Sequence, residues 1–435
     1  MHDLRPFYFS VVFWGERFRD YLTDFCLPSL LSPNNIPSLR GGRHNRFIFC
    51  TTPDDWAVLT LSPIFSLLER YIHPYFAEIS LPLPGRSGCE HMGVGHKLAT
   101  EMAHKDEAYG VFITPDLMIS DGSVAALERH AQAGRRVVLS AALRFGEEPL
   151  FENLRAMGIL WEEERLSLLG RPLTITSRAM VGVALRSFHS ETRRYEWEAP
   201  YFTSFPSACW WRVPSEDGIV VHSLSWAPLL LDYSIVGRHD TRVLESWTID
   251  ADYVYRNFGD GEGIHVVTDS DEIMLVSWAP LSDRPQSLAP SRIKSLPVIG
   301  EWAKGAFLRG AITSGIFDPL KQRIFFLPVR WHARELTPSW LMTERKARRT
   351  LRRYLPDLEP RRAQKPARKA ALGWLFLRVL AVCARVGMVL EDAFAYPERR
   401  RAVLRQAMRG DCEAVKHVSR WFRVAWRRIR GMPIG

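Results

Sequence analysis

The chain has 435 residues, 46% of them hydrophobic, so it can bury a core large enough for two or three domains. Its first residues lack the features of a secretory signal, and its six cysteines form no Cys-x-x-Cys pair, which argues against a secreted disulfide scaffold or a zinc-finger protein. The net charge of +10 is uneven: residues 301–435 carry 30 basic and 11 acidic residues, whereas residues 1–300 carry 28 and 37. This split indicates an acidic catalytic body with a basic appendage that meets an anionic partner.

The first 145 residues alternate between predicted strands and predicted helices. Short apolar runs bounded by turn residues predict strands at 7–14, 46–50, 76–83, 109–116 and 136–142. Helical spacing or proline at a first turn predicts helices at 16–31, from Pro53, and at 63–71, 96–104 and 123–133, with a glycine-rich loop at 85–95. The alternation predicts an α/β fold, with a mostly parallel sheet and helices on both faces.

The segment YGVFITPDLMISDGS, residues 109–123, is the most informative part of the chain. Its apolar strand ends in Thr114-Pro115-Asp116, and a carboxylate at the carboxyl end of such a strand lies where open α/β sheets bind ligands. Asp121 is expected to cap the helix that starts near Ser123. A strand ending in Pro-Asp before an Asp-Gly turn also occurs in α/β proteins of any function. The order of the surrounding elements is therefore needed to decide whether this segment binds a ligand.

That order resembles the metal- and nucleotide-binding corner of GT-A glycosyltransferases, over roughly residues 5–145 and more loosely over 145–280. Those enzymes carry an Asp-x-Asp pair at this position, whereas here Thr114 takes the first place and Asp116 the second. The resemblance implies a GT-A-like fold in which the base and ribose of a nucleotide sugar are bordered by Trp14, Gly15, Thr51 and Thr52. It also implies that the diphosphate faces the loop and helix that contain His96 and Lys97, where backbone N–H groups at a helix amino end favour anions.

The same resemblance implies a divalent cation, Mn²⁺ or Mg²⁺, bound by Asp116 and bridging the two phosphates. His222 is the candidate for an additional histidine ligand from the carboxyl half. Because Thr114 replaces an acid, cation binding is expected to be weaker, or the enzyme works without a metal.

The second half changes in character after a helical region that includes residues 177–190. Aromatic-rich short strands are predicted at 208–213, 219–223, 264–268 and 273–278. Aromatic side chains there stack on sugar rings or form the core; the candidates are Trp197, Tyr201, Phe202, Trp210, Trp211 and Trp226.

Two literal Asp-x-Asp pairs lie in this half. Asp250 or Asp252 is the expected base that takes the proton of the acceptor hydroxyl, or a metal-side acid. Strand alternation would place both side chains on one face, and a turn would also keep them close. Asp269 and Asp271 are either a rival metal corner or a solvated turn between two strands.

We expect three parts: a nucleotide-sugar-binding half at 1–145, an acceptor-side half at 146–285 and a basic helical region at 286–435. Residues 371–390 have the length of a membrane span, but two arginines interrupt them, so a core or interfacial helix is expected. Residues 420–430 combine arginine with Trp and Phe, as helices lying on a membrane surface do. No nucleic-acid-binding signature is present, so nucleic acid is not the expected partner.

Together these features predict a cytoplasmic glycosyltransferase, peripheral at the inner face of the plasma membrane. Its expected partners are a nucleotide-sugar donor, a surface-polysaccharide or lipid-linked acceptor, and an anionic membrane. The alternative is a non-catalytic GT-A-like scaffold whose altered acidic motif leaves only binding.

Overall fold

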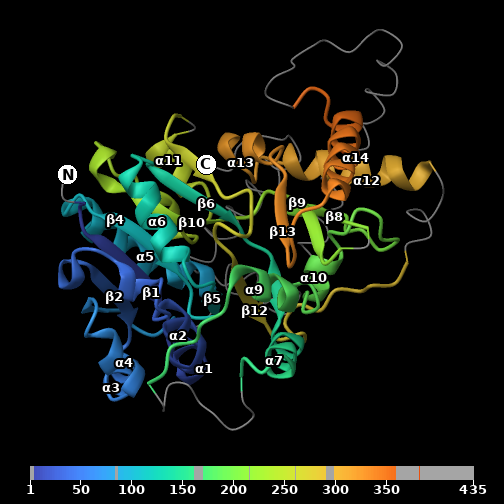
Figure 1. Ribbon diagram of the computed structural model, residues 1–435. Helices are drawn as coiled ribbons and strands as arrows, with labels where there is room; N and C mark the ends of the chain where they lie inside the picture. The colour runs from blue at the N-terminus through green and yellow to red at the C-terminus, as the bar shows by residue number, and fades with distance from the viewer. Residues whose placement is uncertain are drawn as a thin grey trace, which may run out of the picture.

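The computed structural model describes residues 4–83, 87–160, 170–214, 216–259, 261–290, 298–358 and 382. Apart from residue 382, the helices predicted at 371–390 and 420–430 lie outside these residues. The described part is an α/β structure built around a mostly parallel sheet, which confirms these two parts of the predicted fold class (Figure 1).

The main sheet has seven strands in the order β11-β6-β10-β4-β1-β2-β3. Six of these strands are parallel to one another, and β10 is antiparallel to both of its neighbours. Their bounds are β1 Phe7–Val12, β2 Arg46–Thr51, β3 His73–Glu78, β4 Tyr109–Ile113, β6 Val137–Ala141, β10 Trp226–Asp232 and β11 Ile264–Val266. Strands from the first and second predicted parts therefore complete one sheet.

Strand β10 lies between β4 and β6, and the sequence pattern did not predict it. Proline has no backbone N–H to donate to a strand ladder, so Pro228 makes this run differ from a regular strand pattern. The pairing of β10 with β6 shifts register between Pro228 and Leu230, where a bulge accommodates the ring. The third strand was predicted at 76–83 but begins at His73 and ends at Glu78, so this prediction was wrong by several residues.

The two faces of the main sheet are covered by different helices, because successive residues of each strand point to opposite sides. One face packs against α2 (Leu27–Leu30), α4 (Pro63–Leu68) and α6 (Ser123–Gln132), which contribute to one buried cluster. The other face packs against α5 (Gly88–Lys105) and α11 (Tyr253–Phe258). Helices α1 (Glu16–Tyr21) and α3 (Pro53–Leu59) follow β1 and β2, and a π-helical turn at Leu22–Cys26 joins α1 to α2.

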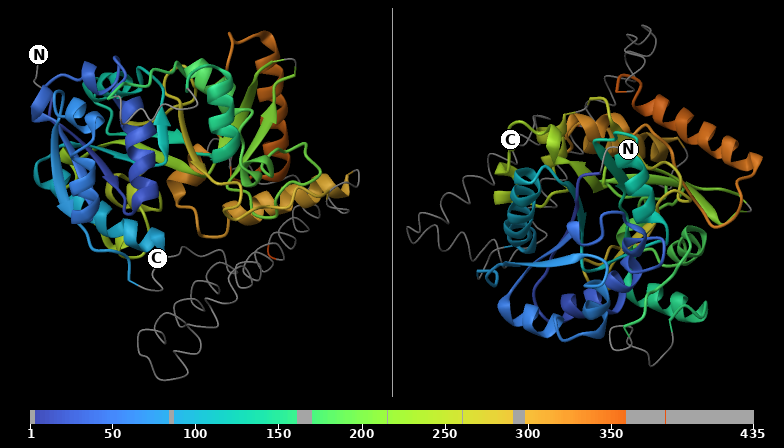
Figure 2. Two further views of the ribbon diagram at one scale, coloured as in Figure 1. Left: turned by 90° about the horizontal axis from the view of Figure 1, so that it is seen from below. Right: turned by 60° about the vertical axis from the view of Figure 1, so that its left-hand side comes forward.

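Two smaller three-stranded sheets complete the described part of the molecule. The first contains β5 (Leu117–Ile119), β12 (Leu275–Ala279) and β7 (Arg144–Gly146); the second contains β13 (Val329–His332), β9 (Gly218–Ser223) and β8 (Ala208–Arg212). The remaining helices are α7 (Glu147–Ala156), α9 (Ser177–Ala184), α10 (Ser190–Arg193), α12 (Ile299–Ile312), α13 (Pro319–Ile324) and α14 (Pro338–Tyr354). Because β13 pairs with β9, part of the predicted region 286–435 packs within the same body. Figure 2 shows α12 and α14 far from the amino-terminal helices.

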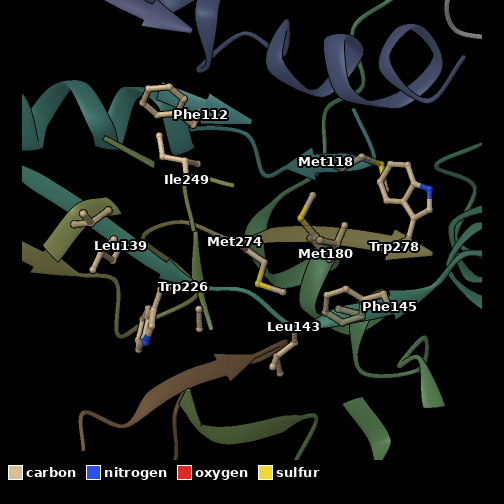
Figure 3. Packing of buried hydrophobic residues seen from close by; sticks show 14 of the residues in the cluster. Phe112, Met118, Leu139, Leu143, Phe145, Met180, Trp226, Ile249, Met274 and Trp278 are labelled. Carbon is tan, nitrogen blue, oxygen red and sulfur yellow. The ribbon is translucent and has the colours of Figure 1, made fainter. Parts of the chain in front are cut away.

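Most of the aromatic side chains proposed for sugar stacking are core residues. Trp197, Phe202, Trp210, Trp211 and Trp226 are all buried. Figure 3 shows Trp226 in the largest cluster, with Met118 beside Trp278 and Phe112 beside Ile249. The core interpretation is therefore correct for these five residues. Within the described residues, no helix combines the length and the apolar character that a bilayer crossing requires.

Candidate functional site

Three adjacent strand ends meet at the carboxyl edge of the main sheet. Val12 of β1 lies opposite Cys50 of β2, and Val11 lies opposite Ile113 of β4, so the residues that follow these strands emerge side by side. The structure therefore brings together the predicted positions Trp14, Gly15, Thr51, Thr52, Thr114 and Asp116.

The turn between β1 and α1 is held by Asp55, a residue that was not among the predicted site residues. Its Oδ2 accepts hydrogen bonds from the Gly15 N–H at 2.8 Å and from the Thr52 hydroxyl at 2.9 Å, and its Oδ1 accepts one from Arg19 at 2.9 Å. Gly15 has a φ of +80°, which only glycine adopts readily. The Thr52 hydroxyl is thus committed to the cap of α3, and Thr52 can offer a ligand little beyond its backbone.

Several polar atoms near this edge are buried without a hydrogen-bond partner among the described residues. They include Oγ1 of Thr51, at the end of β2, and Nδ1 of His96, which packs edge-on against Phe112 of β4. Leaving a buried donor or acceptor unpaired costs about 1–3 kcal/mol. Such atoms are candidates for pairing with a bound ligand or water.

Asp116 lies just beyond β4, and its side chain is half-buried. Burial raises the pKa of its carboxyl group, while the Thr114 hydroxyl and the positive charges of Arg144 and Arg17 act in the opposite direction. Arg17 also pairs with Glu147 at 3.0 Å, and Arg144 lies 3.5 Å from Asp283. The charged groups that act most strongly on Asp116 are therefore cationic.

These surroundings do not suit a divalent cation at Asp116. Among the described residues, two groups of His, Asp and Glu side chains converge closely enough to hold a metal ion, and neither contains Asp116 or His222. Arg144 and Arg17 would repel a cation, whereas they would attract the phosphates of a nucleotide.

Helix α5 begins at Gly88, eight residues before the predicted start, with a capping box formed by Ser87 and Glu90. Most of the predicted glycine-rich loop at 85–95 is therefore helical. Lys97 lies in the middle of α5, so the prediction that it accompanies the N–H groups of a helix amino end is wrong.

The amino-terminal half of α5 passes close to Asp250. Burial lowers the pKa of His96 to about 4, and the negative charge of Asp250 acts in the opposite direction. Cys89 is also close enough to Asp250 for the carboxylate charge to add to burial in raising the thiol pKa, while Arg284 and Arg144 oppose the rise. Asp250, His96 and Arg144 thus surround one region at the carboxyl edge.

Asp250 and Asp252 lie in a turn before α11, which is the second of the two arrangements expected for this pair. Ile249 anchors this turn in the core beside Phe112 (Figure 3). Asp250 is exposed and accepts a hydrogen bond from the Thr248 hydroxyl. Asp252 pairs with Arg256 at 2.6 Å, which leaves Asp250 as the more available carboxylate.

Trp247 is the aromatic residue that this turn presents to solvent, with half of its surface exposed. The backbone carbonyls of Leu244 and Trp247 rest against Gly93 of α5, where a Cβ atom would lie 2.1 and 2.5 Å from the two oxygens. Sequence alone could not separate this exposed Trp from the buried ones, because its exposure depends on packing with α5.

His222 is a core residue of the sheet formed by β8, β9 and β13. Its Nδ1 lies 2.9 Å from the carbonyl oxygen of Phe325, its ring packs edge-on against Trp211, and burial lowers its pKa to about 4. Its placement does not support the predicted role as a metal ligand.

Asp269 and Asp271 form an ion-pair network with neighbouring segments. The Nε2 of His332, on β13, lies 2.8 Å from Asp269, and Asp271 receives a bidentate contact from Arg178 with a shortest distance of 2.8 Å. This group can hold a metal by distance alone, but arginine already neutralises one of its acids. Its contacts attach β13 to the loop after β11.

An open cavity of roughly 430 Å³ lies near Leu281. Three arginines are among its lining residues, namely Arg186, Arg193 and Arg212. Arg144, on β7, is not among them, but its partner Asp283 is two residues from Leu281, which lines the cavity. An anionic group fits such a surface.

Arg17 and Arg144 were both missed at the level of sequence. Arg144 comes two residues after the predicted strand at 136–142, so a search for charged residues of either sign after each predicted strand would have found it.

Comparison of the chain with protein-family models and with curated proteins finds no match.

Proposed function

We propose that the protein is a glycosyltransferase that moves a sugar from a nucleoside-diphosphate donor to a hydroxyl group of a surface polysaccharide or lipid-linked glycan. The observation that carries the proposal is the position of Asp116 at the carboxyl end of a central strand, where the charges of Arg17 and Arg144 act on it. The mostly parallel sheet is compatible with the GT-A-like arrangement that the sequence resembles.

In this proposal the two arginines bind the donor diphosphate. Guanidinium groups form bidentate hydrogen bonds with phosphate oxygens, and they neutralise the charge that develops on the leaving nucleotide. Asp116, held half-buried near them, accepts hydrogen bonds from donor hydroxyl groups. The unpaired Thr51 hydroxyl is a further group for the donor to satisfy.

Asp250 is the proposed general base. Asp250 is exposed and lies close to His96, on the other side of the strand ends. Asp252 forms an ion pair with Arg256, whereas the Asp250 carboxylate forms none among the described residues. Its carboxylate takes the proton of the acceptor hydroxyl as the hydroxyl oxygen attacks the anomeric carbon and the nucleotide departs. Trp247, exposed in the same turn, offers an aromatic face for a sugar ring.

The arginine-lined cavity favours an acceptor that carries a phosphate or carboxylate group. The proposed location at an anionic membrane surface fits such an acceptor and is supported by the exposed arginines of α14.

Thermal-shift measurements on the full chain test the proposal against a panel of nucleotide sugars, with and without Mn²⁺. We expect one donor to raise the melting temperature without a metal requirement, since arginines rather than a cation meet the diphosphate. Asp116→Asn and Arg144→Gln should abolish that shift and donor turnover while leaving the melting temperature of the free protein near the wild-type value.

Asp121→Asn is the matched control in the same segment. The Asp121 carboxylate accepts hydrogen bonds from Ser32 and Asn34, so this variant should melt earlier and still bind the donor. If no nucleotide sugar stabilises the wild-type chain, the enzyme assignment fails.

The second candidate is a binding scaffold without catalysis. It is favoured by Thr114 in place of an acid and by the poor fit of Asp116 to a cation. Donor-dependent stabilisation without any donor hydrolysis or transfer would support the scaffold and exclude the enzyme.

A further inference from the structure

Three side chains from three different elements converge beside the edge strand of the main sheet. His130 lies in the last turn of α6, His265 lies on β11, and Glu272 lies in the segment between β11 and β12. The Nε2 atoms of His130 and His265 lie 2.5 and 2.7 Å from the same oxygen, Oε1 of Glu272. The two imidazole rings stack with their centroids 4.1 Å apart.

We propose that His130, His265 and Glu272 bind one divalent transition-metal ion of the zinc type. The three ligand atoms all lie within 4.8 Å of one another. Tetrahedral zinc, with bonds of about 2.1 Å, separates its ligand atoms by roughly 3.4 Å, so a small movement of the Glu272 carboxylate admits the ion. Two imidazoles with one carboxylate suit Zn²⁺, Ni²⁺ or Cu²⁺, whereas Mg²⁺ and Ca²⁺ prefer oxygen ligands.

The proposed metal site is accessible to solvent. The side chains of His130, His265 and Glu272 are 17%, 25% and 25% exposed, so water can occupy the remaining coordination positions. The neighbouring group of Asp269, Asp271 and His332 also converges, but Arg178 already pairs with Asp271. A cation would have to displace that arginine, which makes the histidine pair the better site.

The position of the site indicates a structural role. His265 lies opposite Val138, near the amino end of β6, whereas Arg144 of the proposed donor site follows the carboxyl end of β6. Strand β11 is only three residues long and, among the described strands, pairs with β6 alone. A bound ion would tie this short edge strand to α6 and to the segment that leads into β12.

Titration of the metal-free full chain with ZnSO₄ tests the site, by calorimetry and by melting temperature. We expect one saturable Zn²⁺ site that raises the melting temperature, and no effect of MgCl₂ at the same concentration. His130→Ala, His265→Ala and Glu272→Gln should each weaken Zn²⁺ binding by about tenfold or more, since even changes to residues around metal ligands cost that much. Co²⁺ should give absorption bands in the wild type that His265→Ala removes.

Two control variants separate this site from its rivals. Asp271→Asn removes an acid of the neighbouring group, and His44→Ala removes an exposed histidine elsewhere; both should bind Zn²⁺ like the wild type. Circular dichroism of the metal-free variants checks that each is folded, and Glu272→Gln, which is isosteric, keeps the test valid if a histidine variant unfolds. Wild-type affinity in His130→Ala, His265→Ala and Glu272→Gln, or no saturable binding by the wild type, would overturn the inference.

Discussion

Asp116 and Asp121 lie in one short segment, yet their surroundings shift the pKa values of the two carboxyl groups in opposite directions. Asp121 was predicted to cap α6, but the N-cap residue is Gly122, and Asp121 instead accepts hydrogen bonds from Ser32 and Asn34. These bonds outweigh burial and lower the pKa of Asp121, whereas burial raises that of Asp116. The amino end of α6 is satisfied by Asn35, whose Oδ1 accepts from the Val124 N–H at 2.9 Å. Local sequence could not show this, because the partners come from about ninety residues earlier.

The buried imidazole of His222 predicts a loss of stability in mild acid. Its pKa, lowered by burial to about 4, lies below the ordinary value near 6.5, so its contribution is complete above pH 6.5 and is lost as the pH falls toward 4. His222→Leu should reduce the drop in unfolding free energy between pH 7 and pH 5 by about 2 kcal/mol. Urea unfolding at the two pH values measures this difference.

The variant also loses the hydrogen bond to Phe325, at a cost of about 1 kcal/mol that is the same at both pH values. His73→Leu, at an exposed position on β3, serves as the control and should keep the wild-type dependence. An unchanged pH dependence in His222→Leu would show that the imidazole is protonated or solvated in the folded protein.

Among the elements, α5 shows how glycines set the distance between the sheet and the Asp250 turn. A Cβ atom at Gly93 would lie 2.1 Å from the carbonyl oxygen of Leu244, and backbone cannot yield as a flexible side chain does. Gly93→Ala should therefore lower the unfolding free energy by about 1–3 kcal/mol and displace the turn that carries Asp250. Melting temperature and donor binding, measured together, check both effects.

Gly88→Ala is the matched control on the same helix, because nothing lies within 4 Å of the position that the added methyl group would take. Its stability should equal or slightly exceed that of the wild type, since alanine favours helix. Equal stability of Gly93→Ala and Gly88→Ala would contradict the close approach between α5 and the segment 244–247.

Elements with a simple periodic pattern could be predicted from the sequence, and those defined by tertiary contacts were missed. The strands at β1, β2, β4 and β6 are apolar runs bounded by turn residues, and all four lie close to their predicted positions. Strand β10, which contains Pro228, was not predicted, and the amino-terminal half of α5 was missed because its glycines suggested a loop. At the candidate site, single residues such as Asp116 and Asp250 could be selected, but the cations around them could not, because they come from separate elements.

At the scale of the whole molecule, α14 presents a basic face with apolar residues at one end. Trp340, Ala347 and Leu351 are buried on one side, while Arg345 and Arg349 are exposed on the other, near the exposed Met342. The double variant Arg345→Glu/Arg349→Glu should reduce binding to vesicles containing phosphatidylglycerol by roughly tenfold or more, because each cation contributes to attraction by an anionic surface. Co-sedimentation at low salt measures the change.

The control for this prediction is Arg43→Glu/Arg135→Glu, which makes the same change in net charge at exposed positions outside α14. It should bind vesicles nearly as well as the wild type. An equal loss of vesicle binding in both double variants would mean that only net charge matters. Unchanged vesicle binding in both would show that α14 does not contact the membrane.

Strand β10 lies in the middle of the sheet but comes late in the sequence, and this affects how the chain folds during translation. Strands β4 and β6 are separated by β10 and have no direct pairing, although they precede it by about a hundred residues. During translation the middle of the sheet therefore stays open until residues 226–232 leave the ribosome, with apolar strand edges exposed in the meantime. A nascent chain of this kind is a natural client for chaperones, and a gene divided after residue 145 would yield a first fragment that cannot close its own sheet.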